Sequence, residues 1–262
     1  MTCNVLYLTS RCNFACEYCY EHKGQDCASE LFDLDENQAI KNVEDIIAKE
    51  PDPNIQTMIV LFGGEPTLNW DVCKKAAQHA FKLKENVFFC LSTNGWMFRH
   101  DEFCKDYIKF ARSVNRQIGI DLSFDGVGNF RRKLLGGGET TQGMYKVLVN
   151  MAKYNIKYSL RYTIHQGNID YAAKDLAIFD KYFKPDKYVL SYDSQNLDPE
   201  AVVRVKNDIR QQYIDGNVTK PLCELVCDIC KKCIKTGEYS YWSHGNIRNL
   251  AAGESADSFG DF

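Results

Sequence analysis

Short apolar segments alternate with helical patterns along most of this chain, and this alternation limits the folds that it can adopt. Six segments are nearly continuous in apolar residues, as expected for parallel strands covered on both faces. They span residues 5–9, 58–62, 87–92, 118–124, 158–164 and 188–192. Between and after them, apolar residues recur at helical spacing. Helices are predicted around residues 39–47, 69–83, 101–114, 144–151, 169–183 and 200–214, and Asp35 and Gln38 are placed as a cap pair for the first.

Six strand–helix units predict an α/β fold with right-handed crossovers. Eight units close a full TIM barrel, so six indicate a (βα)6 partial TIM-type barrel, although a flat doubly wound sheet has the same pattern. In both folds active residues follow the carboxyl ends of the strands. Polar or glycine-rich segments follow four of these ends, at 12–19, 63–66, 92–95 and 123–126. The sequence therefore predicts a site at this edge.

Composition narrows the class of protein. The chain has 262 residues and 45% hydrophobic content, enough for one core and a small appendage. A net charge of −3 offers no electrostatic basis for binding nucleic acid or an anionic membrane. No apolar run approaches the roughly 20 residues of a membrane span. The amino terminus lacks the pattern of a secretory signal, which predicts a cytoplasmic protein.

Seven of the twelve cysteines fall in two clusters, at 12–19 and 223–233. In a chain without an export signal, such spacing indicates metal binding rather than disulfides. Cys12, Cys16 and Cys19 form the motif C-x3-C-x2-C. Iron–sulfur clusters are normally held by four thiolates, so three would leave one iron open to a substrate or cofactor. A zinc site completed by a remote ligand is the alternative.

The first cysteine motif, with the Gly-Gly-Glu-Pro segment at 63–66, resembles the radical S-adenosylmethionine (SAM) superfamily. The resemblance covers residues 1 to about 193 in order and spacing. It implies that Cys12, Cys16 and Cys19 hold a [4Fe–4S] cluster and that SAM binds the fourth iron. Reductive cleavage of SAM would then produce a 5′-deoxyadenosyl radical that abstracts a hydrogen atom.

The resemblance also assigns contacts to SAM. Tyr18 corresponds to the aromatic residue beside the adenine, and Gly63, Gly64 and Glu65 correspond to the turn that receives the ammonium group. Two glycines let a backbone approach a ligand closely, and the Glu65 carboxylate complements an ammonium. Taken alone, this segment equally fits a plain turn.

Further polar residues follow the later strands. Segments containing Ser92, Asn94, Ser123 and Asp125 resemble family segments that contact the SAM ribose and carboxylate, although each also fits a glycine-terminated turn. Arg161 is a charged residue inside a predicted buried strand and needs a partner. The SAM carboxylate, a substrate anion or a structural ion pair would each serve.

The second cysteine cluster contains Cys223, Cys227, Cys230 and Cys233. Four thiolates suffice for a zinc ion, but an auxiliary [4Fe–4S] cluster is favoured because the first motif already implies iron–sulfur loading. Residues 216–262 resemble a truncated form of SPASM, the Cys-rich extension of peptide-modifying radical SAM enzymes such as anaerobic sulfatase-maturating enzymes. The predicted domains are therefore residues 1–215, the barrel, and 216–262, the extension.

This extension departs from the SPASM pattern. Trp242 and Ser243 stand where a cysteine would fall, and no Asp follows. Sulfatase-maturating enzymes place a catalytic base at that Asp, so formylglycine formation is in doubt. His244 is a weak candidate base, since a lone His is more often solvated.

The sequence as a whole predicts a radical SAM enzyme acting on a peptide or protein side chain, with flavodoxin or ferredoxin as electron donor. Two alternatives stay open. One is a radical SAM enzyme acting on a small molecule or nucleobase. The other is a non-catalytic zinc or iron–sulfur binding protein.

Overall fold

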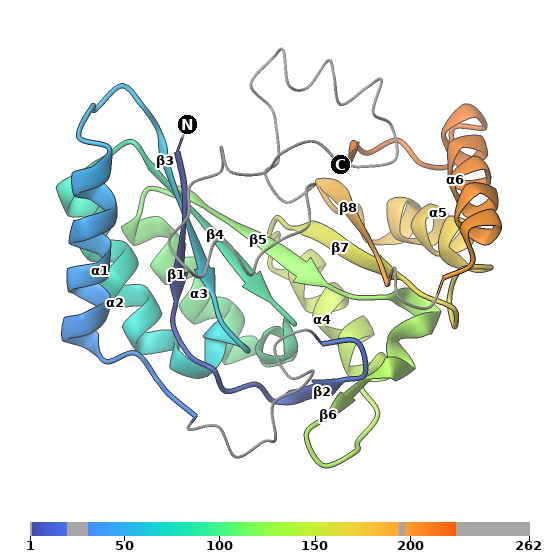
Figure 1. The fold of residues 1–262 in the computed structure, drawn as a ribbon, viewed down its shortest axis with the longest axis horizontal. Helices are drawn as coiled ribbons and strands as arrows, with labels where there is room; N and C mark the ends of the chain where they lie inside the picture. Colours follow the sequence, from blue (N-terminus) through green and yellow to red (C-terminus); the bar gives the residue numbers. More distant parts are fainter. Residues whose placement is uncertain (1, 20–30, 194–196, 224–262) are drawn as a thin grey trace.

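A parallel sheet forms the centre of the fold (Figure 1). The structure is a computed structural model and describes residues 2–19, 31–193 and 197–223. The strands of the sheet, in spatial order, are β1 (Thr2–Tyr7), β3 (Thr57–Phe62), β4 (Val87–Thr93), β5 (Ile118–Ser123), β7 (Ser159–Ile164), β8 (Lys187–Tyr192) and β9 (Leu222–Cys223). Every predicted strand is present. The first begins at Thr2 rather than at residue 5, because the amide of Thr2 already bonds to the carbonyl of Gln56.

Six helices separate the strands, as predicted. They are α1 (Glu36–Lys49), α2 (Trp70–Leu83), α3 (Asp101–Ser113), α4 (Thr141–Lys153), α5 (Ala172–Tyr182) and α6 (Pro199–Ile214). Short 3-10 helices follow three of the strands: η1 (Pro66–Asn69), η2 (Trp96–Arg99) and η3 (Gly126–Arg131). A separate ribbon pairs β2 (Phe14–Cys16) with β6 (Arg132–Leu134) in antiparallel fashion.

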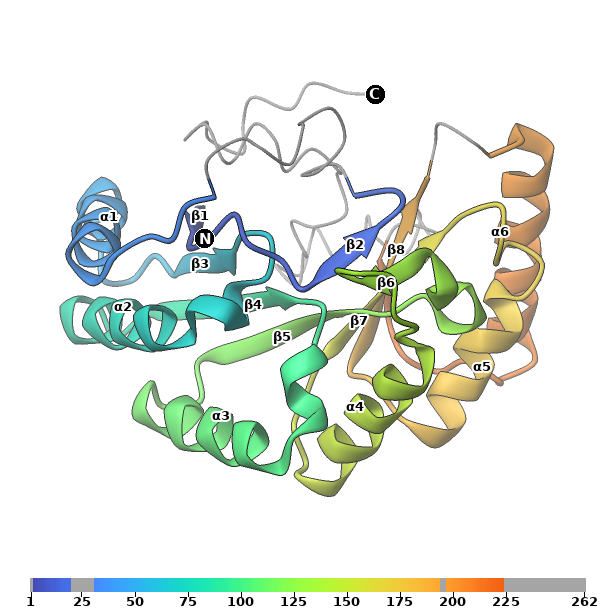
Figure 2. The same cartoon turned by 90° about the horizontal axis from the view of Figure 1, so that it is seen from below.

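The strand order distinguishes a partial barrel from a doubly wound sheet. Neighbours follow one another in chain order from β1 to β9, and all pairs are parallel. A doubly wound sheet reverses its order at a switch point, and no reversal occurs among the described strands. Right-handed crossovers without reversal place all helices on one face. Figure 2 shows these helices as an outer layer around a curved sheet, which confirms the partial barrel.

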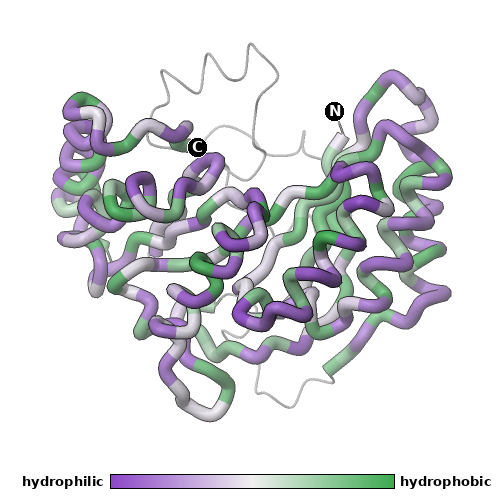
Figure 3. The backbone as a smooth tube through the Cα atoms, turned by 180° about the vertical axis from the view of Figure 1, so that it is seen from behind, coloured by the Kyte–Doolittle hydropathy of each residue, from purple (hydrophilic) through white to green (hydrophobic). Residues whose placement is uncertain are grey.

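Apolar side chains pack on both faces of the sheet. The larger core lies between strands and helices, and a smaller cluster on the opposite, concave face contains Met58, Val60, Phe62, Cys90 and Val189. Figure 3 shows green strands beside helices that alternate between green and purple, as expected for helices with one buried face.

The cap predicted for α1 is present. The side chain of Asp35 accepts a hydrogen bond from the Gln38 amide at 2.9 Å, and the Gln38 side chain bonds back to the Asp35 amide. This reciprocal capping box satisfies two amides that the helix itself leaves without partners.

The described part of the chain ends at the edge of the sheet. Strand β9 pairs with β8 through Tyr188 and Val189, so two residues of the predicted extension belong to the sheet. The boundary at 216 stays a prediction, because Cys227, Cys230, Cys233 and His244 lie outside the described residues. Among the helices that are described, none is long and apolar enough to cross a membrane.

Candidate functional site

The first cysteine motif occupies the loop after β1 and the short strand β2. The Cys12 sulfur accepts a hydrogen bond from the Phe14 amide at 3.3 Å, and the Cys16 carbonyl accepts one from the Cys19 amide at 3.0 Å. All three thiols are half-buried, and their loop follows the carboxyl end of β1. The edge predicted from the sequence therefore does carry the motif.

The environment of these thiols suits a cationic group. Burial, and to a smaller extent the nearby Glu65 carboxylate, raise the pKa of Cys12 to about 12. Burial also raises the pKa of Cys16, while the positive charge of Arg132 opposes the rise. The thiolate form therefore needs a positive partner, which bound iron supplies.

A four-iron cluster requires a different arrangement of thiolates from a single metal ion. In the described residues, no three His, Cys, Asp or Glu side chains converge as one metal ion requires. Thiolates that hold a four-iron cluster bind different irons, so they surround the cluster without converging on one point. Cys12, Cys16 and Cys19 are the residues that would hold it.

The Gly63–Gly64 turn packs directly against the cysteine loop. The Gly64 amide donates to the Thr9 carbonyl at 2.8 Å, and the Glu65 amide donates to the Arg11 carbonyl at 2.8 Å. A Cβ at Gly63 would lie 2.3 Å from the Thr9 oxygen, and one at Gly64 would lie 2.5 Å from the Arg11 oxygen. The glycines are thus required by the chain itself, a role that the sequence analysis did not assign.

Glu65 is fully buried and its carboxylate accepts several hydrogen bonds from the protein. It accepts hydrogen bonds from the Thr67 amide at 3.1 Å and hydroxyl at 2.5 Å, the Thr93 hydroxyl at 2.7 Å and the Asn94 amide at 2.7 Å. These bonds join the turn after β3 to the end of β4. Burial raises the pKa of Glu65, and the hydrogen bonds lower it. The contact with the SAM ammonium stays a prediction.

Asn94 links the end of β4 to the cysteine loop. Its side-chain amide donates to the Asn13 side chain at 2.7 Å and lies 3.8 Å from the Cys12 sulfur. Its side-chain oxygen accepts from the Trp96 amide at 3.0 Å. Asn94 therefore lies beside the cluster position.

Tyr18 is held by two charged groups that follow β5. Its hydroxyl donates to the Asp125 carboxylate and accepts from the Arg132 guanidinium at 2.9 Å. Its ring lies 5.9 Å from that of His165. Arg132 and His165 were not predicted as site residues, because both lie far from the motif in sequence.

His165 is a fully buried histidine beside Tyr18. Its Nδ1 accepts from the Gly167 amide at 3.0 Å, so its Nε2 carries the proton and donates to the Gly128 carbonyl at 3.2 Å. Burial lowers the pKa of His165. The ring thus connects the turn at Gly167 to the backbone of η3 beside Tyr18.

Arg161 forms a structural ion pair, one of the three kinds of partner that the sequence allowed. Its guanidinium pairs with the buried Asp121 carboxylate at 2.7 Å and donates to the Ser191 hydroxyl at 3.2 Å. Ser123 is the register partner of Arg161, and Ser92 is that of Asp121. These side chains alternate with core residues such as Leu122, so they face the concave side. The ion pair accounts for the charge of Arg161, and its contact with SAM stays a prediction.

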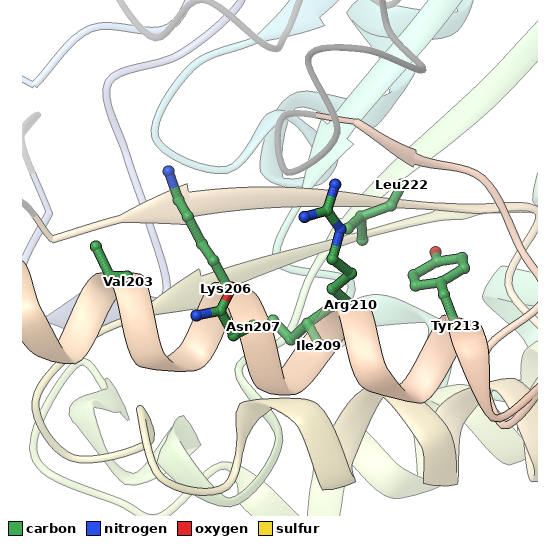
Figure 4. A pocket seen from close by; sticks show the side chains of 7 residues that line it. All are labelled: Val203, Lys206, Asn207, Ile209, Arg210, Tyr213 and Leu222. Atoms are coloured by element: carbon green, nitrogen blue, oxygen red, sulfur yellow. The ribbon is translucent and has the colours of Figure 1, made fainter.

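A shallow pocket of about 230 Å³ lies elsewhere, between α6 and β9 (Figure 4). Lys206, Arg210 and Tyr213 extend into it beside apolar side chains such as Leu222. None of the predicted site residues lines this pocket. The cysteine loop therefore remains the candidate site.

Known proteins resemble this chain over most of its length. The radical SAM cyclopropyl synthase TigE of Paramaledivibacter caminithermalis is 24% identical over 274 residues, which cover 96% of this chain and 51% of TigE. The Fe-coproporphyrin III synthase of Methanosarcina barkeri is 27% identical over 176 residues, 66% of this chain and 39% of that protein. The chain thus spans about half the length of TigE and less than half the length of the Fe-coproporphyrin III synthase.

Solved structures share the fold. Native anSMEcpe with bound AdoMet superposes with a TM-score of 0.66 at 17% identity, covering 84% of this chain and 63% of anSMEcpe. Streptococcus suis SuiB bound to S-adenosylmethionine gives a TM-score of 0.57 at 17% identity, covering 86% of this chain and 51% of SuiB. The model of the Radical SAM superfamily matches residues 6–177. With its three cysteines at the carboxyl edge of a partial barrel, this chain belongs to the radical SAM superfamily.

Proposed function

We propose that this protein reductively cleaves SAM and uses the resulting radical to abstract hydrogen from a peptide or protein side chain. The observation that carries the proposal is the position of Cys12, Cys16 and Cys19, which the Gly63–Gly64 turn and the Asn94 side chain hold at one edge of the barrel. Family membership favours an enzyme over a non-catalytic binding protein.

The chain's own residues would divide the work. Three thiolates would hold a [4Fe–4S] cluster, which supplies the electron for SAM cleavage when it is bound. The turn at Gly63, Gly64 and Glu65 would orient the SAM ammonium. Tyr18, Ser92, Asn94, Ser123 and Asp125 are proposed for the remaining contacts with SAM. Arg161 is proposed to contact the SAM carboxylate, with its ion pair to Asp121 holding the guanidinium in place.

Similarity to a peptide-bound structure supports a peptide substrate. One solved structure is of anSMEcpe with bound AdoMet and the Kp18Cys peptide, and its fold covers 84% of this chain with a TM-score of 0.65.

The four cysteines at 223–233 are proposed to hold an auxiliary iron–sulfur cluster, and flavodoxin or ferredoxin is the proposed electron donor.

Anaerobic reconstitution tests the first step. Reduced protein given SAM is expected to form 5′-deoxyadenosine, and Cys16→Ala should abolish this product. Cys230→Ala is the matched control, because it removes one thiol from the second cysteine cluster and should leave part of the SAM cleavage intact. Wild-type protein that loads iron and sulfide but forms no 5′-deoxyadenosine would contradict the proposal.

The iron content tests the auxiliary cluster. About eight irons per chain correspond to two four-iron clusters, and about four irons correspond to one cluster.

Action on a small-molecule substrate is the second candidate function, because the similarity to Fe-coproporphyrin III synthase covers 66% of this chain. Deuterium transfer from a labelled peptide into 5′-deoxyadenosine would favour the peptide.

A further inference from the structure

Arg132 lies directly opposite a cluster cysteine. Figure 2 shows β2 beside β6, and in the ribbon that these strands form Cys16 and Arg132 are register partners. Residues directly opposite each other in an antiparallel pair have Cβ atoms about 4.5–5.5 Å apart and side chains on the same face. The Arg132 side chain therefore lies on the face of the ribbon that carries the Cys16 thiol.

The charge of Arg132 is buried and only partly compensated. Arg132 as a whole is only 7% exposed. Its Nη1 donates to the Tyr18 hydroxyl at 2.9 Å and lies 3.7 Å from the Asp125 carboxylate. Burying a guanidinium costs free energy unless its donors are satisfied.

One donor of this guanidinium has no acceptor among the described residues. The Nε–H of Arg132 is buried and finds no hydrogen-bond partner in the described part of the chain. Such groups are rare in folded proteins and call for an explanation. Thiolate and sulfide sulfurs accept hydrogen bonds, and those of a cluster held by Cys16 would lie on this side of the ribbon.

We infer that Arg132 is a tuning residue, which directs its charge and its Nε–H toward the sulfurs of the cluster at Cys16 and thereby raises the reduction potential of that cluster. The inference rests on the proposed function, since it requires a cluster at the first cysteine motif. Reduction adds one negative charge to the cluster, and a buried cation and hydrogen bonds to sulfur stabilise that charge. Arg132 would thus ease electron uptake from an external donor.

The neighbouring Lys133 provides a matched control. It lies opposite Ala15 in the same ribbon, so its side chain points to the other face. Its side chain is 43% exposed and its ammonium lies 3.3 Å from the Glu17 carboxylate. Replacing Lys133 removes the same formal charge as replacing Arg132. Because Lys133 is exposed, solvent and salt screen the effect of its charge on the cluster.

The test is a potentiometric titration followed by electron paramagnetic resonance, on anaerobically reconstituted full-length protein without SAM. The relevant signal is the one that Cys16→Ala removes. Arg132→Gln is expected to lower the reduction equilibrium constant of that cluster at least tenfold, about 59 mV for one electron. Lys133→Gln should leave it within a factor of two. Equal shifts in both variants, or no shift in Arg132→Gln, would overturn the inference.

A second variant, Arg132→Lys, and measurements of SAM binding and cluster loading keep the test decisive. Arg132→Lys keeps the charge that compensates Asp125 but lacks the Nε–H, so it should load the cluster and show a smaller decrease even if Arg132→Gln does not load. A wild-type potential in Arg132→Lys would show that no hydrogen bond from Nε acts on the cluster. A wild-type potential in Arg132→Gln combined with weaker SAM binding would assign Arg132 to SAM instead. Wild-type protein that loads no cluster would refute the proposed function rather than this inference.

Discussion

Single buried residues connect the strand ends to the cysteine loop. Glu65 accepts hydrogen bonds from residues after β3 and from the end of β4. Asn94 then extends these contacts to Asn13 and the Cys12 sulfur. Buried polar networks of this kind specify one arrangement only when all of their members are satisfied. Substitutions in this network are therefore expected to affect both stability and cluster loading.

Glu65→Gln tests the network. An amide NH₂ in place of either oxygen would face the amide of Thr67 or that of Asn94, and would leave this donor without an acceptor. The free energy of unfolding in urea should decrease by about 1–3 kcal/mol. Glu36→Gln is the control, because that carboxylate is half exposed and pairs with Lys75 at the surface. A similar loss in both variants would refute the role of the network.

Gly64→Ala tests the contact between the turn and the cysteine loop. The new Cβ would lie 2.5 Å from the backbone oxygen of Arg11, so the cysteine loop would have to move. Iron incorporation should fall several-fold, and overpacking should cost about 1–3 kcal/mol of stability. In the control Gly138→Ala, the nearest atom is the flexible end of the Leu134 side chain at 3.0 Å. Wild-type iron content in Gly64→Ala would contradict the expectation.

Between elements, ion pairs join neighbouring helices on the outer layer. Asp101 in the first turn of α3 lies 2.8 Å from the Lys153 ammonium at the end of α4. The hydrogen bond from Lys153 lowers the pKa of Asp101 below its ordinary value of 3.8. A depressed carboxyl pKa stabilises the fold above the unfolded pKa, and this stabilisation is lost as pH falls through the folded value.

Asp101→Asn should therefore lower the urea midpoint at pH 6, and its difference from wild type should shrink as the pH falls below about 4. Lys153→Met should show the same pH dependence if the pair is the cause. A difference that does not change between pH 6 and pH 3 would show that the negative charge of Asp101 is not its cause, because that charge is largely lost over this range.

At the scale of the whole molecule, cofactor binding and stability should be linked. If SAM binds the folded protein and not the unfolded chain, as the proposed function requires, SAM at a hundred times its Kd should add about 2.7 kcal/mol to the free energy of unfolding. Thermal unfolding of the reconstituted protein would measure this effect. Cys16→Ala should show no such shift, since it cannot complete the cluster. Equal shifts in both proteins would place SAM elsewhere.

The architecture could be predicted from the sequence because its signals are local. Apolar runs such as 87–92 became strands, and the Asp35–Gln38 pair became a capping box. The start of β1 was misplaced, since its pairing with β3 begins in a polar stretch at Thr2. The choice between barrel and flat sheet required the strand order, which apolar periodicity does not encode.

The sequence by itself determined the superfamily and predicted the cluster cysteines, because C-x3-C-x2-C is a spacing within one loop. Only the tertiary structure placed Arg132 against Tyr18, 114 positions away, and gave Arg161 its partner Asp121 on another strand. These contacts arise because crossovers bring strand ends together at one edge of the sheet. A charged residue reveals in sequence that it needs a partner, but the fold decides which partner it meets.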